Sequence, residues 1–212
     1  MTSPRRALVL IDVQNEYFSG PLEIQYPPHA ESLPNITAVI DAATAADLPI
    51  VVVQHTAGDE APVFNPGRPG FALHPEVGSR RADSWHSITK QYGSVFAGTE
   101  LFGWLRERNV DTVTFVGYMT NNCVISSAAA AADQGLSAEV LSDATGAISI
   151  ANDAGSADAE AVHTTIMTLL HSNWASVSST TTWTEALKAG TPLPKSNLVT
   201  SATTGRQRSS HP

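Results

Sequence analysis

The sequence predicts an α/β fold with a parallel sheet, and three observations lead to that prediction. Short runs of aliphatic and β-branched residues recur along the chain, and stretches with helical periodicity lie between them. A strand that is apolar at every position is typical of a parallel sheet that helices cover on both faces. The chain of 212 residues is also long enough to bury a core without disulfides or metal ions.

The strands are predicted by the apolar runs. Three runs are uninterrupted and predict buried strands at 7–11, 50–53 and 112–116. Two weaker runs predict further strands at 138–141 and 175–177. Between the first two strands, Ile36, Val39, Ile40 and Ala43 recur at the spacing of one helical face, and Pro34 lies near the start of that helix. The other helices are expected at about 99–105, at 122–134 before Gly135, and at 158–171.

Two segments depart from this alternation. Residues 58–84 are rich in proline and glycine and predict a long loop, which in a compact domain is usually functional or disordered. Residues 190–212 are rich in serine, threonine and proline, and we expect a tail that is flexible or that crosses to a neighbouring subunit. The predicted organisation is therefore one domain over residues 1–189 and a tail over residues 190–212.

The composition and charge exclude several classes of partner. Twelve basic residues against 20 acidic ones give a net charge of −8, which repels phosphate backbones and argues against a nucleic-acid partner. The first apolar run ends at Asp12, so it is too short for a secretion signal or a membrane span. We expect a cytoplasmic protein that does not associate with membranes and whose partner is a small molecule.

Two reactive side chains are expected where predicted strands end. Asp12 directly follows the first strand, and Cys123 lies where the segment 117–123 turns from a strand into a helix. Ligands of parallel α/β sheets bind at this edge. In the first turn of a helix, the dipole and the backbone N–H groups favour a thiolate and can bind an oxyanion. The alternatives are a turn-forming role for Asp12 and a small buried apolar role for Cys123.

A lysine is the third candidate, although its position alone does not distinguish it from an ordinary solvated loop lysine. Lys90 lies shortly before the predicted 99–105 helix, in a chain with only 12 basic residues.

Three sequence blocks together resemble the isochorismatase-like cysteine hydrolases. They are DVQNEYF at 12–18, Lys90 followed by Ser94, Phe96, Thr99 and Leu101, and Gly117 followed by Thr120, Cys123 and Val124. The superfamily includes nicotinamidases, N-carbamoylsarcosine amidases, ureidoacrylate and biuret amidohydrolases, and isochorismatase itself. The resemblance extends from about residue 7 to residue 183.

The resemblance implies a fold and a site. The fold would be a Rossmann-like, three-layer α/β/α sandwich with a six-stranded, mostly parallel sheet. Asp12, Lys90 and Cys123 would form a catalytic triad, and the backbone N–H groups of Met119 and Cys123 would form the oxyanion hole. A cis bond between Tyr118 and Met119 would aim the first of these N–H groups. The reaction implied is hydrolysis of a C–N bond through a thioester, without a cofactor.

Departures from individual family members narrow the expected chemistry. Metal-dependent nicotinamidases carry an Asp-x-His motif and further histidines after the second strand, whereas this chain has Gln54 and His55 there, with Asp59 and His74 at other spacings. We therefore expect neither a metal ion nor nicotinamidase activity. Isochorismatases proper lack the nucleophilic cysteine, so Cys123 favours C–N hydrolysis. The substrate-binding candidates are Tyr17, Phe64, Tyr118, Asn121 and Asn122, and we expect a small amide, ureido or carbamoyl substrate.

Other classes of function stay open at this point. The chain could be a vinyl-ether hydrolase of the isochorismatase type, a catalytically silent member that binds a metabolite, a thiol sensor based on Cys123, or a mildly acidic interaction scaffold. Four tryptophans, a long loop with apolar residues and the tail together predict a homo-oligomer, as a dimer or a tetramer.

Overall fold

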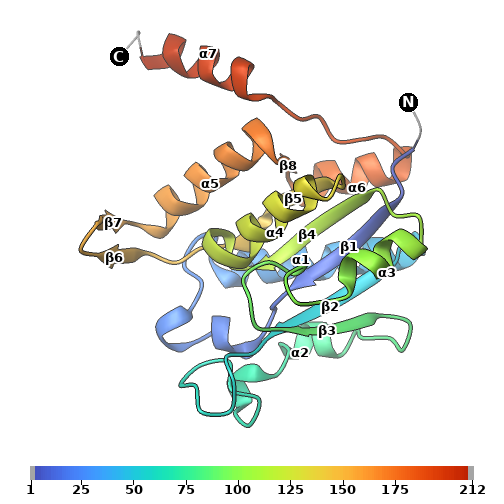
Figure 1. The fold of residues 1–212 in the computed structure, drawn as a ribbon, viewed down its shortest axis with the longest axis vertical. Helices are drawn as coiled ribbons and strands as arrows, with labels where there is room; N and C mark the ends of the chain where they lie inside the picture. The colour runs from blue at the N-terminus through green and yellow to red at the C-terminus, as the bar shows by residue number, and fades with distance from the viewer. Residues whose placement is uncertain (1–2, 210–212) are drawn as a thin grey trace.

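A computed structural model describes residues 3–209, and residues 1–2 and 210–212, at the ends of the predicted domain and tail, lie outside the described residues. Its centre is a sheet of six parallel strands in the order β3-β2-β1-β4-β5-β8 (Figure 1). The strands are β1 (Arg6–Ile11), β2 (Ile50–His55), β3 (His86–Lys90), β4 (Thr112–Tyr118), β5 (Ser137–Gly146) and β8 (Ala175–Ser178). The predicted α/β sandwich is therefore confirmed, and all six strands are parallel.

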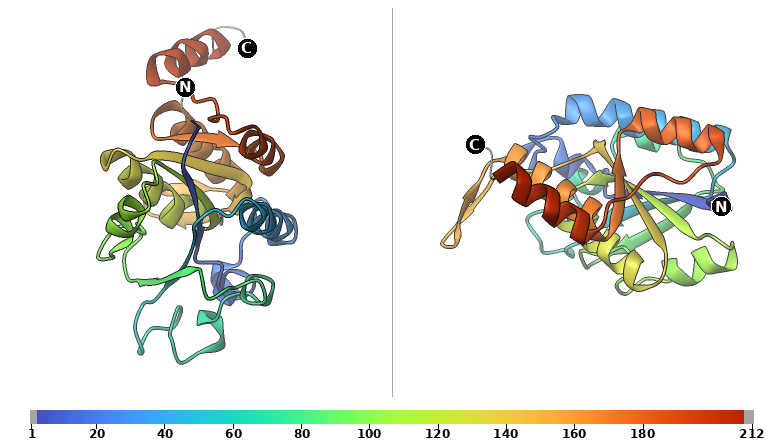
Figure 2. Two further views of the ribbon diagram at one scale, coloured as in Figure 1. Left: turned by 90° about the vertical axis from the view of Figure 1, so that its right-hand side faces the viewer. Right: turned by 90° about the horizontal axis from the view of Figure 1, so that it is seen from above.

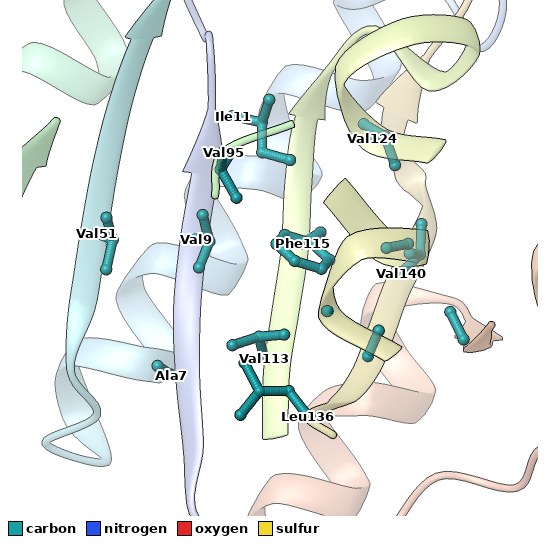
Figure 3. Close-up of a cluster of buried hydrophobic side chains, with 14 of the residues drawn as sticks. Ala7, Val9, Ile11, Val51, Val95, Val113, Phe115, Val124, Leu136 and Val140 are labelled. Atoms are coloured by element: carbon teal, nitrogen blue, oxygen red, sulfur yellow. The ribbon is translucent and has the colours of Figure 1, made fainter. Parts of the chain in front are cut away.

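Helices cover both faces of this sheet (Figure 2). One face packs against α1 (His29–Ala45), α2 (Pro75–Gly78) and α6 (Thr180–Ala189), and the other against α3 (Leu101–Glu107), α4 (Ile125–Asp133) and α5 (Ala159–Asn173). Alternate residues of β1 enter two different cores, because Leu8 and Leu10 belong to the first and Val9 and Ile11 to the second. Figure 3 shows the second core, where Val9 and Phe115 lie side by side on neighbouring strands. Burial on both faces explains why these strands are apolar at every position.

The strand β3 is absent from the set of strands that the apolar runs predict. It lies at the edge of the sheet, and its burial alternates, with Ile88 and Lys90 buried and Ser87 and Thr89 exposed. A strand that is buried on one face only has no continuous apolar run. Lys90 is consequently the last residue of a strand, and the alternative of a solvated loop lysine is wrong.

The expected long loop at 58–84 contains local structure. Two short turns of helix interrupt it, the 3-10 helix η3 (Pro69–Phe71) and the helix α2. His74 caps α2 by accepting the N–H of Glu76, and Pro75 occupies the first helical position. The remaining short elements are the 3-10 helices η1 (Asn15–Tyr17) and η2 (Gly20–Leu22), the π-helical turn η4 (Thr120–Val124) and the hairpin of β6 (Ile150–Asn152) and β7 (Gly155–Ala157).

The tail, which is expected to be flexible or to cross to a neighbouring subunit, is packed at its start and helical at its end. Its first residues pack on the domain, since Leu193 is buried and the carbonyl of Thr191 accepts a hydrogen bond from Arg6 at 2.7 Å. It then forms the helix α7 (Leu198–Ser209), which lies beyond the β8 edge of the sheet, contacts α5 and buries none of its residues (Figures 1 and 2). Asn197 accepts the N–H of Thr200 at the start of this helix, a capping signal in a segment whose composition otherwise suggests a flexible chain. No helix among residues 3–209 has the length and hydrophobicity needed to cross a membrane.

Candidate active site

Three strands, β1, β3 and β4, bring the predicted triad to the carboxyl end of the sheet, and β2 lies between β3 and β1. Asp12 follows β1, Lys90 ends β3, and Cys123 lies in η4 directly after β4. The turn after β1 is tightly constrained, because Asp12 adopts a left-handed φ of 50° and its N–H donates to the carbonyl of Val53. On the other side of β1, the backbones of Gly117 and Ile11 approach each other closely. Only glycine fits at position 117, since a Cβ atom there would lie 2.1 Å from the Ile11 carbonyl oxygen.

The three side chains are in direct contact. The Lys90 ammonium lies 2.7 Å from Oδ2 of Asp12 and 3.2 Å from Sγ of Cys123. Asp12 is fully buried, and Lys90 and Cys123 are each 2% exposed. A buried charge persists in a protein only where an opposite charge and hydrogen bonds compensate for lost hydration, and here the carboxylate and the ammonium compensate each other.

The electrostatics of the cysteine differ from the expectation that its position favours a thiolate. Burial, reinforced by the Asp12 carboxylate, raises the pKa of the Cys123 thiol to about 12, although Lys90 opposes this shift. Burial also raises the pKa of Asp12, again against the effect of Lys90. The helix terminus and the lysine favour the thiolate, but the loss of hydration on burial has the larger effect. At rest the site therefore holds a thiol beside a carboxylate that is a stronger base than usual.

A histidine on α5 contacts the turn that carries the proposed oxyanion hole. The Tyr118–Met119 peptide bond is cis, as the resemblance implies. Thr120, the first residue of η4, is fully buried, and its hydroxyl lies 3.0 Å from Nδ1 of His163 on α5. His163 is itself buried, which lowers its pKa to about 4 and keeps the ring neutral. No sequence block marks His163, because only the packing of α5 brings it to the turn.

Three of the predicted substrate-binding residues form an aromatic cluster beside the triad. The ring of Tyr17 lies 5.3 Å from that of Phe64 and 5.6 Å from that of Tyr118. Burial, followed by the charges of Asp12 and Cys123, raises the pKa of Tyr17 well above its ordinary value, so its hydroxyl stays protonated and available as a donor. The hydroxyl of Tyr118 already has a partner, Ser32 Oγ at 2.8 Å.

The two asparagines beside the nucleophile differ in their environments. Oδ1 of Asn121 is buried and has no hydrogen-bond partner among the described residues. Asn122 is exposed, and its side chain packs beside Gly93. A buried, unsatisfied amide oxygen is costly unless a ligand or water completes it, so Asn121 is the better placed of the two to meet a substrate.

Two further residues lie near the triad, although the sequence assigns neither of them a role there. His55 ends β2, and its Nδ1 lies 3.3 Å from the Lys90 ammonium. Gln14, which is fully buried, accepts the His55 N–H at 2.7 Å and donates to the His55 carbonyl at 3.1 Å. The position of Gln14 two residues after Asp12 was the available signal. Among residues 3–209, no three His, Cys, Asp or Glu side chains lie close enough to hold a metal ion. In particular, His55 faces a lysine and His74 caps α2.

A parallel α/β sheet with a carboxylate, a lysine and a cysteine gathered at its carboxyl edge defines an enzyme of the α/β class. The family model of the isochorismatase domain matches residues 6–188, and the chain belongs to the isochorismatase family, whose members are hydrolases.

Solved structures and curated relatives agree with this assignment. The crystal structure of a candidate isochorismatase from Burkholderia xenovorans LB400 is 45% identical, with a TM-score of 0.95 over 99% of this chain and 100% of that one. The nicotinamidase/pyrazinamidase of Mycobacterium tuberculosis is 31% identical over 68% of this chain and 88% of its own length. The N-carbamoylsarcosine amidase of Thermoplasma acidophilum, at 24% identity and a TM-score of 0.66 over 83% of this chain and 96% of that one, shares the fold.

Proposed function

We propose that this protein is a cysteine-dependent hydrolase that cleaves a C–N bond of a small amide, ureido or carbamoyl compound through a thioester. The observation that carries the proposal is the contact of one buried ammonium, that of Lys90, with both Asp12 and Cys123. Two relatives bear the names of amide-cleaving enzymes, a nicotinamidase/pyrazinamidase and an N-carbamoylsarcosine amidase, and this supports the reaction class.

The resting protonation states define the first half of the reaction. A thiol whose pKa is about 12 needs a base at neutral pH, and the Asp12 carboxylate, with its raised pKa, is the adjacent base. Asp12 takes the thiol proton as Sγ of Cys123 forms a bond to the carbonyl carbon. The carbonyl electron pair moves onto oxygen, where the N–H groups of Met119 and Cys123 bind the oxyanion. The ammonium of Lys90 stabilises the negative charge as it moves between the carboxylate and the sulfur.

The second half returns the enzyme to its starting state. The oxyanion collapses, the C–N bond breaks, and Asp12 gives its proton to the departing nitrogen. Asp12, again a carboxylate, then deprotonates a water molecule that attacks the thioester. The C–S bond breaks, the acid leaves, and the thiol is restored with its proton.

The surroundings of the triad favour a small substrate with few charges. Tyr17 and Phe64 provide aromatic surface, and Asn121 provides an amide whose oxygen lacks a partner among the described residues. An unpaired acceptor of this kind suits an N–H group of the substrate, such as that of a primary or secondary amide, a urea or a carbamoyl compound with an unsubstituted nitrogen.

An ammonia-release screen over small amides, ureas and carbamoyl compounds tests this function, with Cys123→Ala as the matched inactive variant. Alanine suits the start of a helix, so the variant is expected to fold and to release no ammonia. Acid quenching during turnover, followed by mass spectrometry, is expected to show an acyl adduct on Cys123. Undiminished turnover in Cys123→Ala would exclude the thioester route, and turnover of a vinyl ether by that variant would point to isochorismatase-type chemistry.

A further inference from the structure

The register of the sheet places the side chain of His55 beside that of Lys90. The strands β2 and β3 are parallel, and His55 is paired in register with Lys90 at the carboxyl end of both strands. Residues paired in this way project to the same face, so the contact between His55 Nδ1 and the Lys90 ammonium at 3.3 Å does not depend on a mobile loop.

The Lys90 ammonium has three N–H donors and the structure supplies three partners for them. Oδ2 of Asp12 lies at 2.7 Å, Sγ of Cys123 at 3.2 Å and Nδ1 of His55 at 3.3 Å. Asp12 and Cys123 belong to the proposed reaction, whereas His55 has no part in the proton transfers described above.

The contact determines the tautomer of His55. An ammonium can only donate, so Nδ1 must be the unprotonated nitrogen, and the neutral ring carries its proton on Nε2. Burial, helped by the charge of Lys90, lowers the pKa of His55 to about 4, so the ring stays neutral at physiological pH. The imidazole is therefore a fixed acceptor for a buried charge.

The position of His55 is fixed from the backbone as well as from the ring. The amide of Gln14 binds both the N–H and the carbonyl of His55, and the same amide donates to the carbonyl of Phe71 at 2.8 Å. The ring of Phe64 packs edge-on against the imidazole at 5.0 Å. An acceptor held on both sides loses little entropy when it binds the ammonium.

We infer that His55 is a positioning residue, which accepts the third N–H of Lys90 so that the other two stay directed at Asp12 and Cys123. This inference rests on the proposed function, because it assigns His55 to the same triad. Without this acceptor, the third N–H would lack a partner in a buried site, and the ammonium would turn toward another acceptor and away from the sulfur.

Nitrogen-15 NMR of the histidine side chains tests the tautomer in the unmodified protein. Long-range ¹H–¹⁵N spectra at neutral pH are expected to show His55 protonated on Nε2 and unprotonated on Nδ1, with its signals assigned by their absence in His55→Asn. A merely structural imidazole is not required to adopt this tautomer. A proton on Nδ1 would overturn the inference.

Two variants of similar size then separate the acceptor from the rest of the ring. In His55→Asn, Oδ1 takes the place of Nδ1 and can still accept from Lys90, whereas His55→Leu fills the space without an acceptor. On the best substrate from the screen, we expect kcat of His55→Leu to fall about tenfold with KM little changed, and kcat of His55→Asn to stay within about twofold of wild type. Equal kcat values in the two variants would overturn the inference.

A substrate-free measurement keeps this inference separate from the proposed function. The rate of Cys123 alkylation by iodoacetamide reports on how well Lys90 stabilises the thiolate. It is expected to be lower in His55→Leu than in wild type and to be restored in His55→Asn, even if no amide is hydrolysed. Failure of the substrate screen together with this alkylation pattern would reject the proposed reaction and retain the role of His55, and unchanged alkylation in His55→Leu would reject that role.

Discussion

At the scale of single residues, the central feature is the placement of protons in a buried site. Cys123 and Asp12 both have raised pKa values, because burial penalises the charged form of each. Lys90 opposes both shifts, so the site keeps one negative charge that the carboxylate or the sulfur can carry. Asp12 and Cys123 are therefore suited to transferring a proton during nucleophilic attack, and not to maintaining a free thiolate.

Asp12→Asn is expected to reduce the rate of hydrolysis by about 10²–10⁴, because it removes the base while keeping the shape. Asparagine tolerates the left-handed φ of 50° at this position, but it leaves the buried Lys90 ammonium without its counter-charge, so the melting temperature is also expected to fall. Steady-state kinetics beside a thermal melt of the same sample measure both effects. A variant that keeps wild-type activity would remove Asp12 from the role of general base.

Acidification is expected to destabilise the protein between about pH 6.5 and pH 4. His55 and His163 have folded-state pKa values of about 4 and ordinary values of 6.5 when unfolded. Through these two histidines, the unfolded chain binds up to two more protons than the folded one in that window, so their contribution to the free energy of unfolding falls as the pH falls. Thermal melts across this range should show the decline, and His163→Asn should make it less steep. A flat profile would contradict the neutral burial of these rings.

The sequence blocks identify the residues that react but not those that hold them. Asp12, Lys90 and Cys123 are in contact, as the resemblance implies. The sequence assigns neither His55 nor His163 a role beside the triad, because their partners are set by strand register and by the packing of α5, which local sequence does not encode. The sequence does not predict the raised pKa of the Cys123 thiol for a similar reason, since burial depends on the whole fold.

At the scale of elements, continuous apolar runs identify strands with two buried faces and little else. The runs predict β1, β2, β4, β5 and β8. They do not predict the edge strand β3, in which buried and exposed side chains alternate, or the helix α7, in which none of the described residues is buried. Amphipathic patterns are strong only where one face of an element enters a core. The strand β3 has such a pattern in part, and the helix α7 lacks it.

Two glycine-to-alanine changes test which glycines the elements require. Gly117→Ala is expected to destabilise the protein by about 2 kcal/mol or more, because its φ is 104° and a Cβ would lie 2.1 Å from the Ile11 carbonyl oxygen. Gly103→Ala, at an exposed position of α3 with no atom within 4 Å, should stabilise the protein by about 0.5–1 kcal/mol. Urea denaturation of both variants gives the comparison. A Gly117→Ala protein as stable as wild type would show that β1 and β4 do not approach as closely as described.

At the scale of the whole molecule, one buried ion pair lies near the amino ends of the strands and another lies at their carboxyl ends, and the two have different surroundings. At the amino edge, Arg6 binds Glu139 at 2.9 Å, and Thr114 and Trp183 donate to the same carboxylate. These donors satisfy the carboxylate and connect β1, β4, β5 and α6. At the carboxyl edge, the Asp12–Lys90 pair has a reactive thiol among its neighbours. The first pair is surrounded by hydrogen-bond donors that do not react, whereas the second is in contact with a thiol that can react.

The last prediction is that the protein assembles as a homo-oligomer through α7 and its surroundings. Leu198 and Val199 on α7 are 63% and 76% exposed, and Leu169 on the contacting helix α5 is 47% exposed. Exposed aliphatic side chains on adjacent helices are typical of interfaces, and two-fold contacts are the commonest kind. Truncation after residue 196 retains the packed segment around Thr191 and Leu193 but removes α7. Sedimentation at micromolar concentration is expected to show a dimer or tetramer for the full chain and a smaller species for the truncated one, with the triad intact in both. A full-length chain that sediments as a monomer while fully active would contradict this assembly.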